Sequence, residues 1–501
     1  MVALSEGKKK TGKTRPGISL AALALCLAAI LISCGGGGSD DKGYSYTVRG
    51  VVYGMIGGGL ILQNNGADDL LINANGTFTF SKAIADGAAY NVTIKTQPPT
   101  LSQTCMVSNA TGVINTKPVG NVIISCVPPP PRLTVDPSGR FVYAANYASG
   151  NISAYTIDAA SGSLTPVAGS PFAAGTHPNS LSIDAAGRFL YTANITDGSI
   201  SAYAIDGVAG ILTEVAGSPF AAGTLPHTVT IDPTGTFAYA ANITSGDISA
   251  YAIDGVTGIL TEVAGSPFAA GTQPFAVTID PSGQFAYATN SGSKNISAYT
   301  IDPLTGVLTA GASVSTGRMP CPLVIDPTGR FAYVLNTRSS SVNVFTIGAT
   351  GALIAGPSVA TSGDATHMVI NPLGTFAYIS RTGANRITTH SIANTGTLTS
   401  ASSIATGAKP YMMAMHPTGN FIYVANIQSN SISAYAVKAV GGTLTRIAGS
   451  PFAAGTKPYA LAIDPAGNFL YAFNAVSKTI SAYTIDPVTG GLTPAGAVAS
   501  P

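Results

Sequence analysis

The chain has 501 residues, a length that suggests two or three folded domains. Only 9% of the residues are charged, against about 25% in a typical soluble protein, which excludes a coiled coil or a helical bundle rich in Lys and Glu. The formal net charge is +2, but residues 1–33 hold five basic residues and one acidic residue, so the rest of the chain has a net charge of −2. We therefore expect no basic stripe and no nucleic-acid partner.

The first 33 residues have the pattern of an export signal. Basic residues, among them Lys8 and Arg15, precede an apolar run at 18–32, which is shorter than the ~20 residues of a membrane-spanning helix. Residues 31–34, Leu-Ile-Ser-Cys, resemble the bacterial lipobox, which implies lipidation of Cys34 and attachment to a membrane of the bacterial cell envelope, facing the periplasm or the cell surface. The Gly-rich stretch 34–43 would then be a tether. A plain secretory signal with an incidental cysteine is the alternative.

Residues 44–127 are predicted to form a small β-sandwich. Alternating apolar runs at 46–54, 70–74, 76–84, 89–97 and 121–126 are separated by Gly, Asn and Pro. In an oxidising compartment Cys105 and Cys126 can form a disulfide bond. The domain resembles Ig-like or carboxypeptidase-regulatory-like modules of bacterial surface proteins. Four prolines at 128–131 follow as a stiff linker.

The rest of the chain, 132–501, is repetitive. Eight copies of Asp-Pro-x-Gly-x-Phe-x-Tyr, or close variants, recur every 45 to 48 residues and begin at Asp136, Asp184, Asp232, Asp280, Asp326, Asn371, His416 and Asp464. Asp, Pro and Gly at these spacings predict a type I turn between two strands, and each repeat holds two further strands. Four short strands in each repeat predict an all-β fold, a β-propeller with eight blades. The predicted first inner strand is 132–135 and the last outer strand 491–498, so no strand is left to close the ring by exchange.

These repeats resemble the lactonase-type β-propeller family, which includes 6-phosphogluconolactonase-like enzymes, and the Tyr-Val-Thr-Asn repeat propellers of bacterial surface proteins; residues 423–426 read Tyr-Val-Ala-Asn. The resemblance implies a propeller, usually of seven blades, and a site of His, Arg and Glu around the central opening, with the Glu beside the repeated Asn. No Glu follows that position here, and Glu214 and Glu262 lie on predicted outer strands. The catalytic carboxylate of the family therefore has no counterpart.

Comparison of the repeats predicts where a site lies. Positions that stay fixed serve the scaffold, whereas positions that vary at the mouth of the ring are free to bind. The variable positions flank the proline that opens each inner strand. After it come Asn179, His227, Phe275, Cys321, Tyr411 and Tyr459, with Arg132 and His367 at the equivalent places. Before it come His177, Leu225, Gln273, Met319, Lys409 and Lys457, with Arg318 and Asp364 one residue earlier in their loops.

We expect these side chains to meet at a central funnel, where they would bind a sugar-like or cyclic ligand or a protein partner. A second hypothesis is lactone hydrolysis, with His177, His227 or His367 as general base, Arg318 or Arg381 stabilising the oxyanion, and Asp364 replacing the missing Glu. A third is a structural surface-layer component. No cofactor motif or metal-ligand spacing is present, and Cys321 has no activating neighbour in sequence.

Overall fold

The computed structural model describes residues 44–53, 55, 58–74, 76–98, 104–127, 133–361 and 365–500. These residues form β-strands and turns, and none of them lies in a helix that could cross a membrane. The predicted signal segment, tether and lipid site Cys34, the proline linker, Arg132 and Asp364 fall outside the described residues. The described residues form a small sandwich and a ring of eight sheets.

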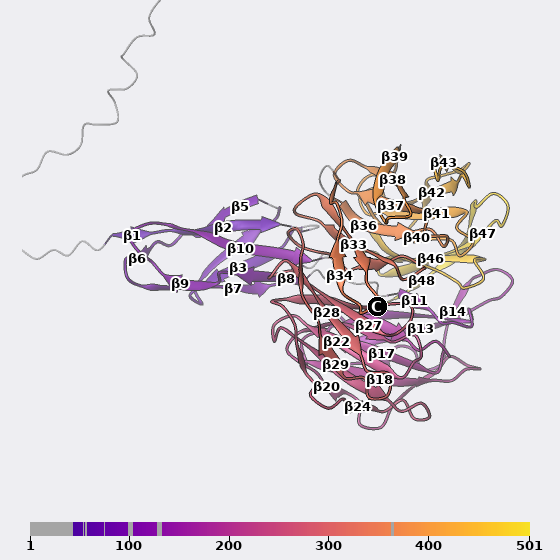
Figure 1. Ribbon diagram of the computed structural model, residues 1–501, viewed down its shortest axis with the longest axis horizontal. Helices are drawn as coiled ribbons and strands as arrows, with labels where there is room; N and C mark the ends of the chain where they lie inside the picture. Colours follow the sequence, from indigo (N-terminus) through magenta and orange to yellow (C-terminus); the bar gives the residue numbers. More distant parts are fainter. Residues whose placement is uncertain are drawn as a thin grey trace, which may run out of the picture. The chain divides into compact units, whose positions relative to one another are not determined.

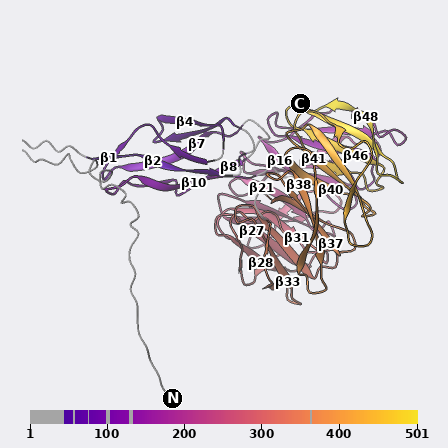
Figure 2. The same ribbon diagram turned by 90° about the horizontal axis from the view of Figure 1, so that it is seen from above.

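The small domain consists of two four-stranded sheets in two layers (Figure 2). One sheet holds β5 (Gly76–Thr79), β2 (Val48–Tyr53), β10 (Val119–Val127) and β8 (Thr104–Ser108); the other holds β4 (Asp68–Ile72), β3 (Leu60–Asn64), β7 (Ala89–Thr96) and β9 (Thr111–Val113); β1 (Ser45–Tyr46) pairs with β6 (Ile84–Ala85). Val48, Leu62 and Val122 belong to the core, because alternation along each strand turns one apolar row inward. Cys105 and Cys126 lie opposite each other on β8 and β10 and are disulfide-bonded, as predicted.

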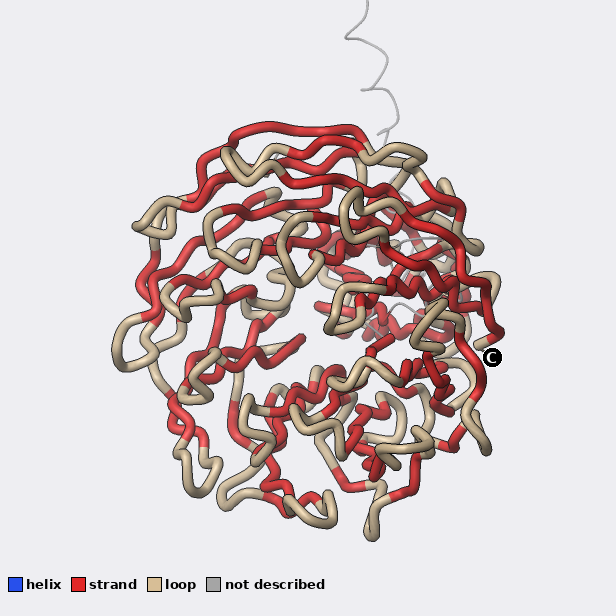
Figure 3. The backbone as a smooth tube through the Cα atoms, turned by 90° about the vertical axis from the view of Figure 1, so that its right-hand side faces the viewer, coloured by secondary structure: helices blue, strands red, loops and turns tan. Residues whose placement is uncertain are grey.

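Residues 133–500 form eight antiparallel sheets, called blades 1 to 8 in chain order, around a common centre (Figure 3). The first strands of neighbouring blades contact one another at most seams and so lie innermost. They are β11 (Leu133–Val135), β16 (Pro178–Ile183), β21 (Pro226–Ile231), β26 (Pro274–Ile279), β31 (Val324–Ile325), β36 (Ala365–Ile370), β40 (Pro410–Met415) and β45 (Pro458–Ile463). The second strands are β12 (Phe141–Asn146), β17 (Phe189–Asn194), β22 (Phe237–Asn242), β27 (Phe285–Asn290), β32 (Phe331–Asn336), β37 (Phe376–Arg381), β41 (Phe421–Asn426) and β46 (Phe469–Asn474).

The third and outer strands complete each blade. The third strands are β13 (Asn151–Ile157), β18 (Ser199–Ile205), β23 (Asp247–Ile253), β28 (Asn295–Ile301), β33 (Ser341–Ile347), β38 (Arg386–Ile392), β42 (Ser431–Val437) and β47 (Thr479–Ile485). Six blades have an outer strand in two pieces: β14 (Leu164–Pro166) and β15 (Phe172–Ala173), β19 (Leu212–Glu214) and β20 (Phe220–Ala221), β24 (Leu260–Glu262) and β25 (Phe268–Ala269), β29 (Leu308–Ala310) and β30 (Val314–Ser315), β34 (Leu353–Ala355) and β35 (Val359–Ala360), β43 (Leu444–Arg446) and β44 (Phe452–Ala453). In blades 6 and 8 it is continuous: β39 (Leu398–Ala405) and β48 (Leu492–Ala499).

The repeated Asp shapes the turn between the first and second strands, as predicted. In blade 3, Asp232 Oδ1 accepts hydrogen bonds from the backbone N–H groups of Thr236 and Phe237, both at 2.7 Å. The other carboxylate oxygen accepts the N–H of Thr234 at 3.1 Å. Because an Asp side chain can satisfy these turn donors, the turn holds the two strands in register.

A ring of tyrosines joins every blade to the next. The tyrosine at the centre of each second strand is buried and donates its hydroxyl hydrogen to the carbonyl of a glycine in the next blade's outer hairpin turn; in blade 3 the pair is Tyr239 and Gly306, at 3.0 Å. The corresponding donors are Tyr143, Tyr191, Tyr287, Tyr333, Tyr378, Tyr423 and Tyr471. All eight blades make this inner bond.

A second set of bonds lies further out. In blade 3, Tyr251 of the third strand donates to the carbonyl of Ala221 in the preceding blade. Tyr155, Tyr203, Tyr299, Tyr435 and Tyr483 make the equivalent bond. Blade 5 has Phe345 and blade 6 has His390 at this position, so six blades carry the outer bond.

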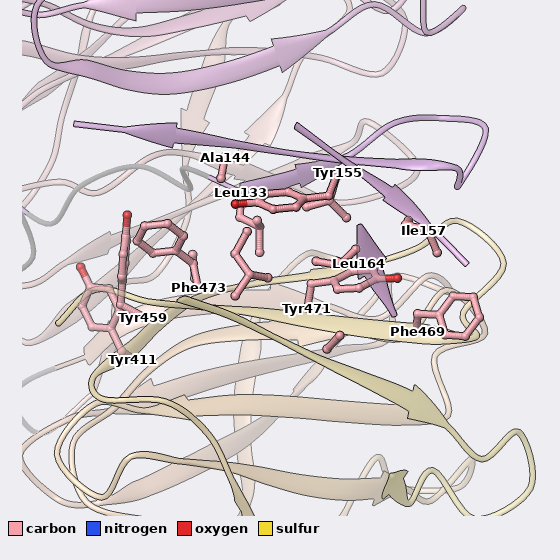
Figure 4. Close-up of a cluster of buried hydrophobic side chains, with 14 of the residues drawn as sticks. Leu133, Ala144, Tyr155, Ile157, Leu164, Tyr411, Tyr459, Phe469, Tyr471 and Phe473 are labelled. Atoms are coloured by element: carbon pink, nitrogen blue, oxygen red, sulfur yellow. The ribbon is translucent and has the colours of Figure 1, made fainter. Parts of the chain in front are cut away.

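The ring closes by packing between blade 1 and blade 8 (Figure 1). Tyr471 of β46 donates to the carbonyl of Gly162 at 3.1 Å, and the two blades share one apolar cluster (Figure 4). Each of these blades is built from its own consecutive strands, so no strand is exchanged, as predicted. The boundaries differ slightly from the prediction: β11 begins at Leu133, and β48 spans Leu492–Ala499.

The repeated Asn is structural, but it bonds differently from expectation. The sequence suggests that its side chain caps a turn through backbone hydrogen bonds. In blade 2, however, Asn194 Nδ2 donates to the hydroxyls of Ser199 and Ser201 on the third strand. The side chain therefore ties the second strand to the third.

Candidate binding face

The strand pairing defines two opposite faces of the ring. Pro178, which begins β16, pairs with Asn194, which ends β17, and other blades repeat this pairing. The start of each first strand and the turn between the second and third strands therefore lie at the same end of a blade. We call this end of the ring the mouth face. The other two turns of each blade form the opposite end, the turn face.

The residue before the opening proline has a left-handed backbone. His177 has a φ of 60° and Leu225 a φ of 57°, and Gln273, Met319, Lys409 and Lys457 lie between 53° and 57°. Few residues other than Gly and Asn adopt this region. Met319 is buried, whereas Lys409 is exposed. The loop geometry thus holds unlike side chains at equivalent points on the mouth face.

The residues after the opening proline contact one another in two groups and pack between blades. Asn179 Nδ2 donates to the carbonyl of His227 at 2.9 Å, and His227 Nδ1 lies 2.9 Å from the carbonyl of Phe275. The rings of His227 and Phe275 are 4.3 Å apart. Tyr411 and Tyr459 are 3% and 1% exposed and lie at one end of an apolar cluster (Figure 4). These side chains form an inner collar and offer little surface to a ligand.

His367 sits one residue further along its strand than expected. Ala365 pairs with Arg381 as Pro178 pairs with Asn194, so Thr366 occupies the position after the proline. His367 Nδ1 accepts the N–H of Met413 at 3.3 Å, and burial lowers the pKa of His367 to about 4. The ring is therefore neutral near pH 7, with one nitrogen already engaged.

Arg381 and His367 lie on opposite sides of the same sheet. Arg381 pairs with Arg386 and Ala377 pairs with His390, and alternation along the strands places Arg381 and His390 on one side. His367 pairs with Ser380, on the other side. Burial, and then the charge of Arg381, lower the pKa of His390. The fold therefore does not bring Arg381 and His367 together on one side of the blade.

His177 lines a shallow pocket between blades 1 and 2. Its ring stacks on Tyr147, with centroids 4.3 Å apart, and Nδ1 lies 2.7 Å from Thr196 Oγ1. The exposed carboxylate of Asp197 accepts the N–H of Thr176 at 2.5 Å. Tyr147, Thr176, His177 and Asp197 line a cavity of about 280 Å³. His177 therefore lies in an open cavity with polar lining groups.

The other candidate groups are dispersed or unreactive. Blades 2 and 3 supply His177 and His227, and blade 6 supplies His367. The described residues hold no group of three His, Cys, Asp or Glu side chains that could bind a metal ion. Burial raises the pKa of the Cys321 thiol to about 12, so this cysteine is protonated at neutral pH and is a poor nucleophile.

The charges of the propeller are segregated between its two faces, which corrects the expectation of no basic stripe. Among the described residues, the mouth face carries eight cations and two carboxylates, whereas the turn face carries four cations and eleven carboxylates. The mouth-face cations are Lys294, Arg318, Arg338, Arg381, Arg386, Lys409, Lys457 and Lys478, and all belong to blades 4 to 8. We call them the cationic arc. Asp197 and Asp247, the two carboxylates, lie in blades 2 and 3.

Sequence reasoning missed part of this face. Tyr147, Asp197, Lys294 and Lys478 lie in the turns between the second and third strands, outside the loops around the proline that the sequence predicts to bind. The fourth residue of this turn is glycine in blades 1 to 3 but Lys294 in blade 4 and Lys478 in blade 8. An alignment of these turns across the eight repeats reveals these four residues.

The fold and the mouth face define an eight-bladed β-propeller with a charged, variable rim. Overlapping segments at 125–177, 168–273, 264–363, 354–453 and 414–501 match the family described as "Lactonase, 7-bladed beta-propeller". Because the matched segments cover more than half of the chain, the protein belongs to this family. It has eight blades where the family description has seven. A comparison with curated proteins found no match.

Solved structures share the propeller fold. A protein described as a putative 6-phosphogluconolactonase from Bacteroides fragilis is 24% identical, with a TM-score of 0.52, over 64% of this chain and 96% of its own. A second, described in the same way, from Bacteroides uniformis is 21% identical, with a TM-score of 0.50, over 65% and 96%. Sqt1 from Saccharomyces cerevisiae is 11% identical, with a TM-score of 0.55, over 70% and 91%. At these identities the likeness shows the fold alone.

Proposed function

We propose that this protein is a lipid-anchored component of the bacterial cell envelope that binds a small sugar-like or cyclic ligand at the mouth face. The observation that carries the proposal is the pocket of Tyr147, His177 and Asp197. These residues come from separate turns, yet each is the only one of its type at its position among the aligned repeats. Scaffold needs do not explain them, because the neighbouring blades fold in the same way with other residues.

The pocket offers the groups that a sugar ring requires. The stacked rings of Tyr147 and His177 supply an apolar wall, and aromatic side chains make such contacts without losing much conformational freedom. The carboxylate of Asp197 and the hydroxyl of Thr176 line the same cavity and supply hydrogen-bonding groups. A compact ligand with several hydroxyls fits a polar cavity of this size.

The neighbouring seam provides a matched control for the binding test. Between blades 2 and 3, Ile195, Leu225 and Ser245 occupy the three positions, and Ser245 Oγ accepts the N–H of Thr224 as Asp197 accepts that of Thr176. The variant Tyr147→Ile/His177→Leu/Asp197→Ser therefore copies a sequence that the fold already accepts.

We expect this variant to keep the stability of the original chain and to lose binding on a glycan array followed by calorimetry. The same substitutions in reverse at the second seam test whether the three side chains suffice to create a site. A ligand that binds the original chain and the variant with equal affinity would place the site elsewhere and overturn this assignment.

Lipid anchoring is supported by the Leu-Ile-Ser-Cys sequence at 31–34. A diacyl anchor supplies two or more buried chains, enough for stable attachment. Labelling of cells with a fatty-acid analogue should mark the chain, and Cys34→Ser should abolish the label and release the protein from membranes. Retention of label by the Cys34→Ser variant would reject this anchor.

Lactone hydrolysis is the second candidate, favoured by the family match. In this mechanism His177, His227 or His367 acts as the general base, and Asp364 replaces the absent Glu. Hydrolysis of sugar lactones should then fall by about 10²-fold or more in His177→Leu, His227→Ala or His367→Ala. Equal rates in the original chain and all three variants would remove this function.

A further inference from the structure

Five members of the cationic arc have no role in the described structure. The side-chain nitrogens of Lys294, Arg318, Lys409, Lys457 and Lys478 form no hydrogen bond or ion pair with any described residue. By contrast, carboxylates of the turn face accept turn N–H groups, as Asp232 does. Turn chemistry thus explains the acidic face, whereas no contact with a described residue accounts for these five cations.

Four of these lysines have a left-handed backbone, which is informative where other blades have glycine. Lys294, Lys409, Lys457 and Lys478 have φ values between 51° and 57°, a region in which side chains other than Gly and Asn are disfavoured. In the turn that holds Lys294 and Lys478, blades 1 to 3 have glycine, which avoids this cost. At Lys294 and Lys478 the chain therefore keeps lysine where glycine fits the backbone better, which points to a use for the charge.

The arc favours an extended and hydrophilic partner. It runs through five consecutive blades, so a small anion would meet only a part of it. Among the exposed large apolar side chains of the described residues, only Val476, 50% exposed, lies on these loops, whereas protein interfaces rely on apolar and aromatic anchors. Tyr411 and Tyr459 are buried, so they provide no aromatic platform for nucleic-acid bases.

We propose that the cationic arc binds an acidic glycan, a polysaccharide whose repeating carboxylate or phosphate groups pair with successive lysines and arginines along blades 4 to 8. The ammonium group of lysine is a compact charge without strict geometry, which suits a hydrated and irregular polymer. Several weak pairs on one chain act together, so the polymer binds far more tightly than its monomer. This surface is separate from the pocket of blades 1 and 2.

The test uses the secreted full-length chain with Cys34→Ser. Polygalacturonate is the carboxylate probe, and polyphosphate is the phosphate probe. Dextran is the uncharged polymer control, and the galacturonic acid monomer is the control with a single charge. The arc variant is Lys409→Gln/Lys457→Gln/Lys478→Gln. The matched control, Lys82→Gln/Lys117→Gln/Lys438→Gln, removes the same charge from exposed lysines elsewhere. Affinity is measured at several salt concentrations.

We expect the original chain and the matched control to bind at least one of the two polymers, more weakly as salt rises, and to ignore dextran and the monomer. The arc variant should bind at least about tenfold more weakly and with a shallower salt dependence, because fewer counterions are released. The polymer that binds identifies the anionic group. Binding of the pocket ligand should stay unchanged in the arc variant, so failure of either proposal is seen separately.

Three results would overturn the proposal. The first is that neither polymer binds, or that both triple variants lose binding equally. The second is that phosphatidylglycerol vesicles bind through the arc while the polymers do not. The third is that the protein self-associates through the arc, with the acidic turn face of a second copy as the partner, and that this accounts for all of its interactions.

Discussion

The propeller has two kinds of seam between blades, which share the inner tyrosine bond and differ in the outer one. The seams among blades 2 to 4 represent the first kind, and the two seams around blade 5 represent the second. Among blades 2 to 4, Tyr251 and Tyr299 donate outer hydrogen bonds to the preceding blade. Around blade 5, Phe345 and His390 replace these tyrosines, and the inner strand β31 has two residues. The inner bonds from Tyr287 and Tyr333 persist across these seams. The difference indicates that the inner tyrosine–glycine contact defines the ring and that the outer bond is an addition.

A substitution at the inner contact should therefore cause the largest loss of unfolding free energy. Gly306 has a φ of 72°, and a Cβ there would lie 2.3 Å from the Phe237 ring. Gly306→Ala should lower the free energy of unfolding by about 2–4 kcal/mol, because backbone strain and overpacking add. Denaturant unfolding measures the change. In the corresponding turn of the preceding blade, Gly255 has an ordinary φ and open space where a Cβ would lie, so Gly255→Ala should have little effect. Equal losses in both variants would contradict this explanation.

Blade 6 should contribute to the pH dependence of stability through His367. The folded pKa of His367 is about 4, below the unfolded value of about 6.5, so its stabilising contribution is complete above pH 6.5 and is lost as pH falls toward 4. This amounts to about 2 kcal/mol between pH 7.5 and pH 5. Ala276 and Ala460 occupy the equivalent position in other blades.

The His367→Ala variant should thus show a flatter dependence of unfolding free energy on pH over this interval. The comparison uses the slope, because removal of the ring changes the absolute stability as well. Parallel curves for the original chain and the variant would show that another group, such as buried His390, carries the acid sensitivity.

The propeller could be predicted from the sequence because its signal is repeated eight times. Each Asp-Pro-x-Gly turn fixes a strand pair by local chemistry, and errors in one copy are corrected by the others. The disulfide of Cys105 and Cys126 was predictable for a similar reason, since few pairings were available. Boundaries moved by one residue, as at Leu133.

The site was less predictable because side-chain direction depends on register. A shift of one residue moves a side chain to the other side of a sheet, which is how His367 comes to lie away from Arg381. The left-handed backbone at Lys457 cannot be inferred from the residue type, which disfavours it. A net charge near zero conceals the segregation of charge, because opposite charges cancel in the sum wherever they lie.

The outer bond can be tested by exchanging residues between the two kinds of seam. Tyr251→Phe removes one hydrogen bond and should cost about 1 kcal/mol of unfolding free energy. Phe345→Tyr places a hydroxyl at the equivalent position of blade 5 and should recover up to about 1 kcal/mol. Thermal and denaturant unfolding would measure both. A destabilising Phe345→Tyr would show that the hydroxyl finds no acceptor and that the seam differs in backbone as well as in sequence.

The smallest effect is expected on the local opening of blade 5. The reaction rate of the Cys321 thiol measures this opening. The thiol is buried, with its pKa raised to about 12, so iodoacetamide at pH 8 should react only when this blade opens. With Cys34→Ser as background, Phe345→Tyr should slow the reaction by up to about fivefold, the equivalent of 1 kcal/mol. Tyr251→Phe acts at a distant seam and should leave the rate unchanged. The contrary result is that Tyr251→Phe accelerates the reaction by the factor that corresponds to its loss of unfolding free energy. That result would show that the ring opens as one unit and that blade 5 does not open on its own.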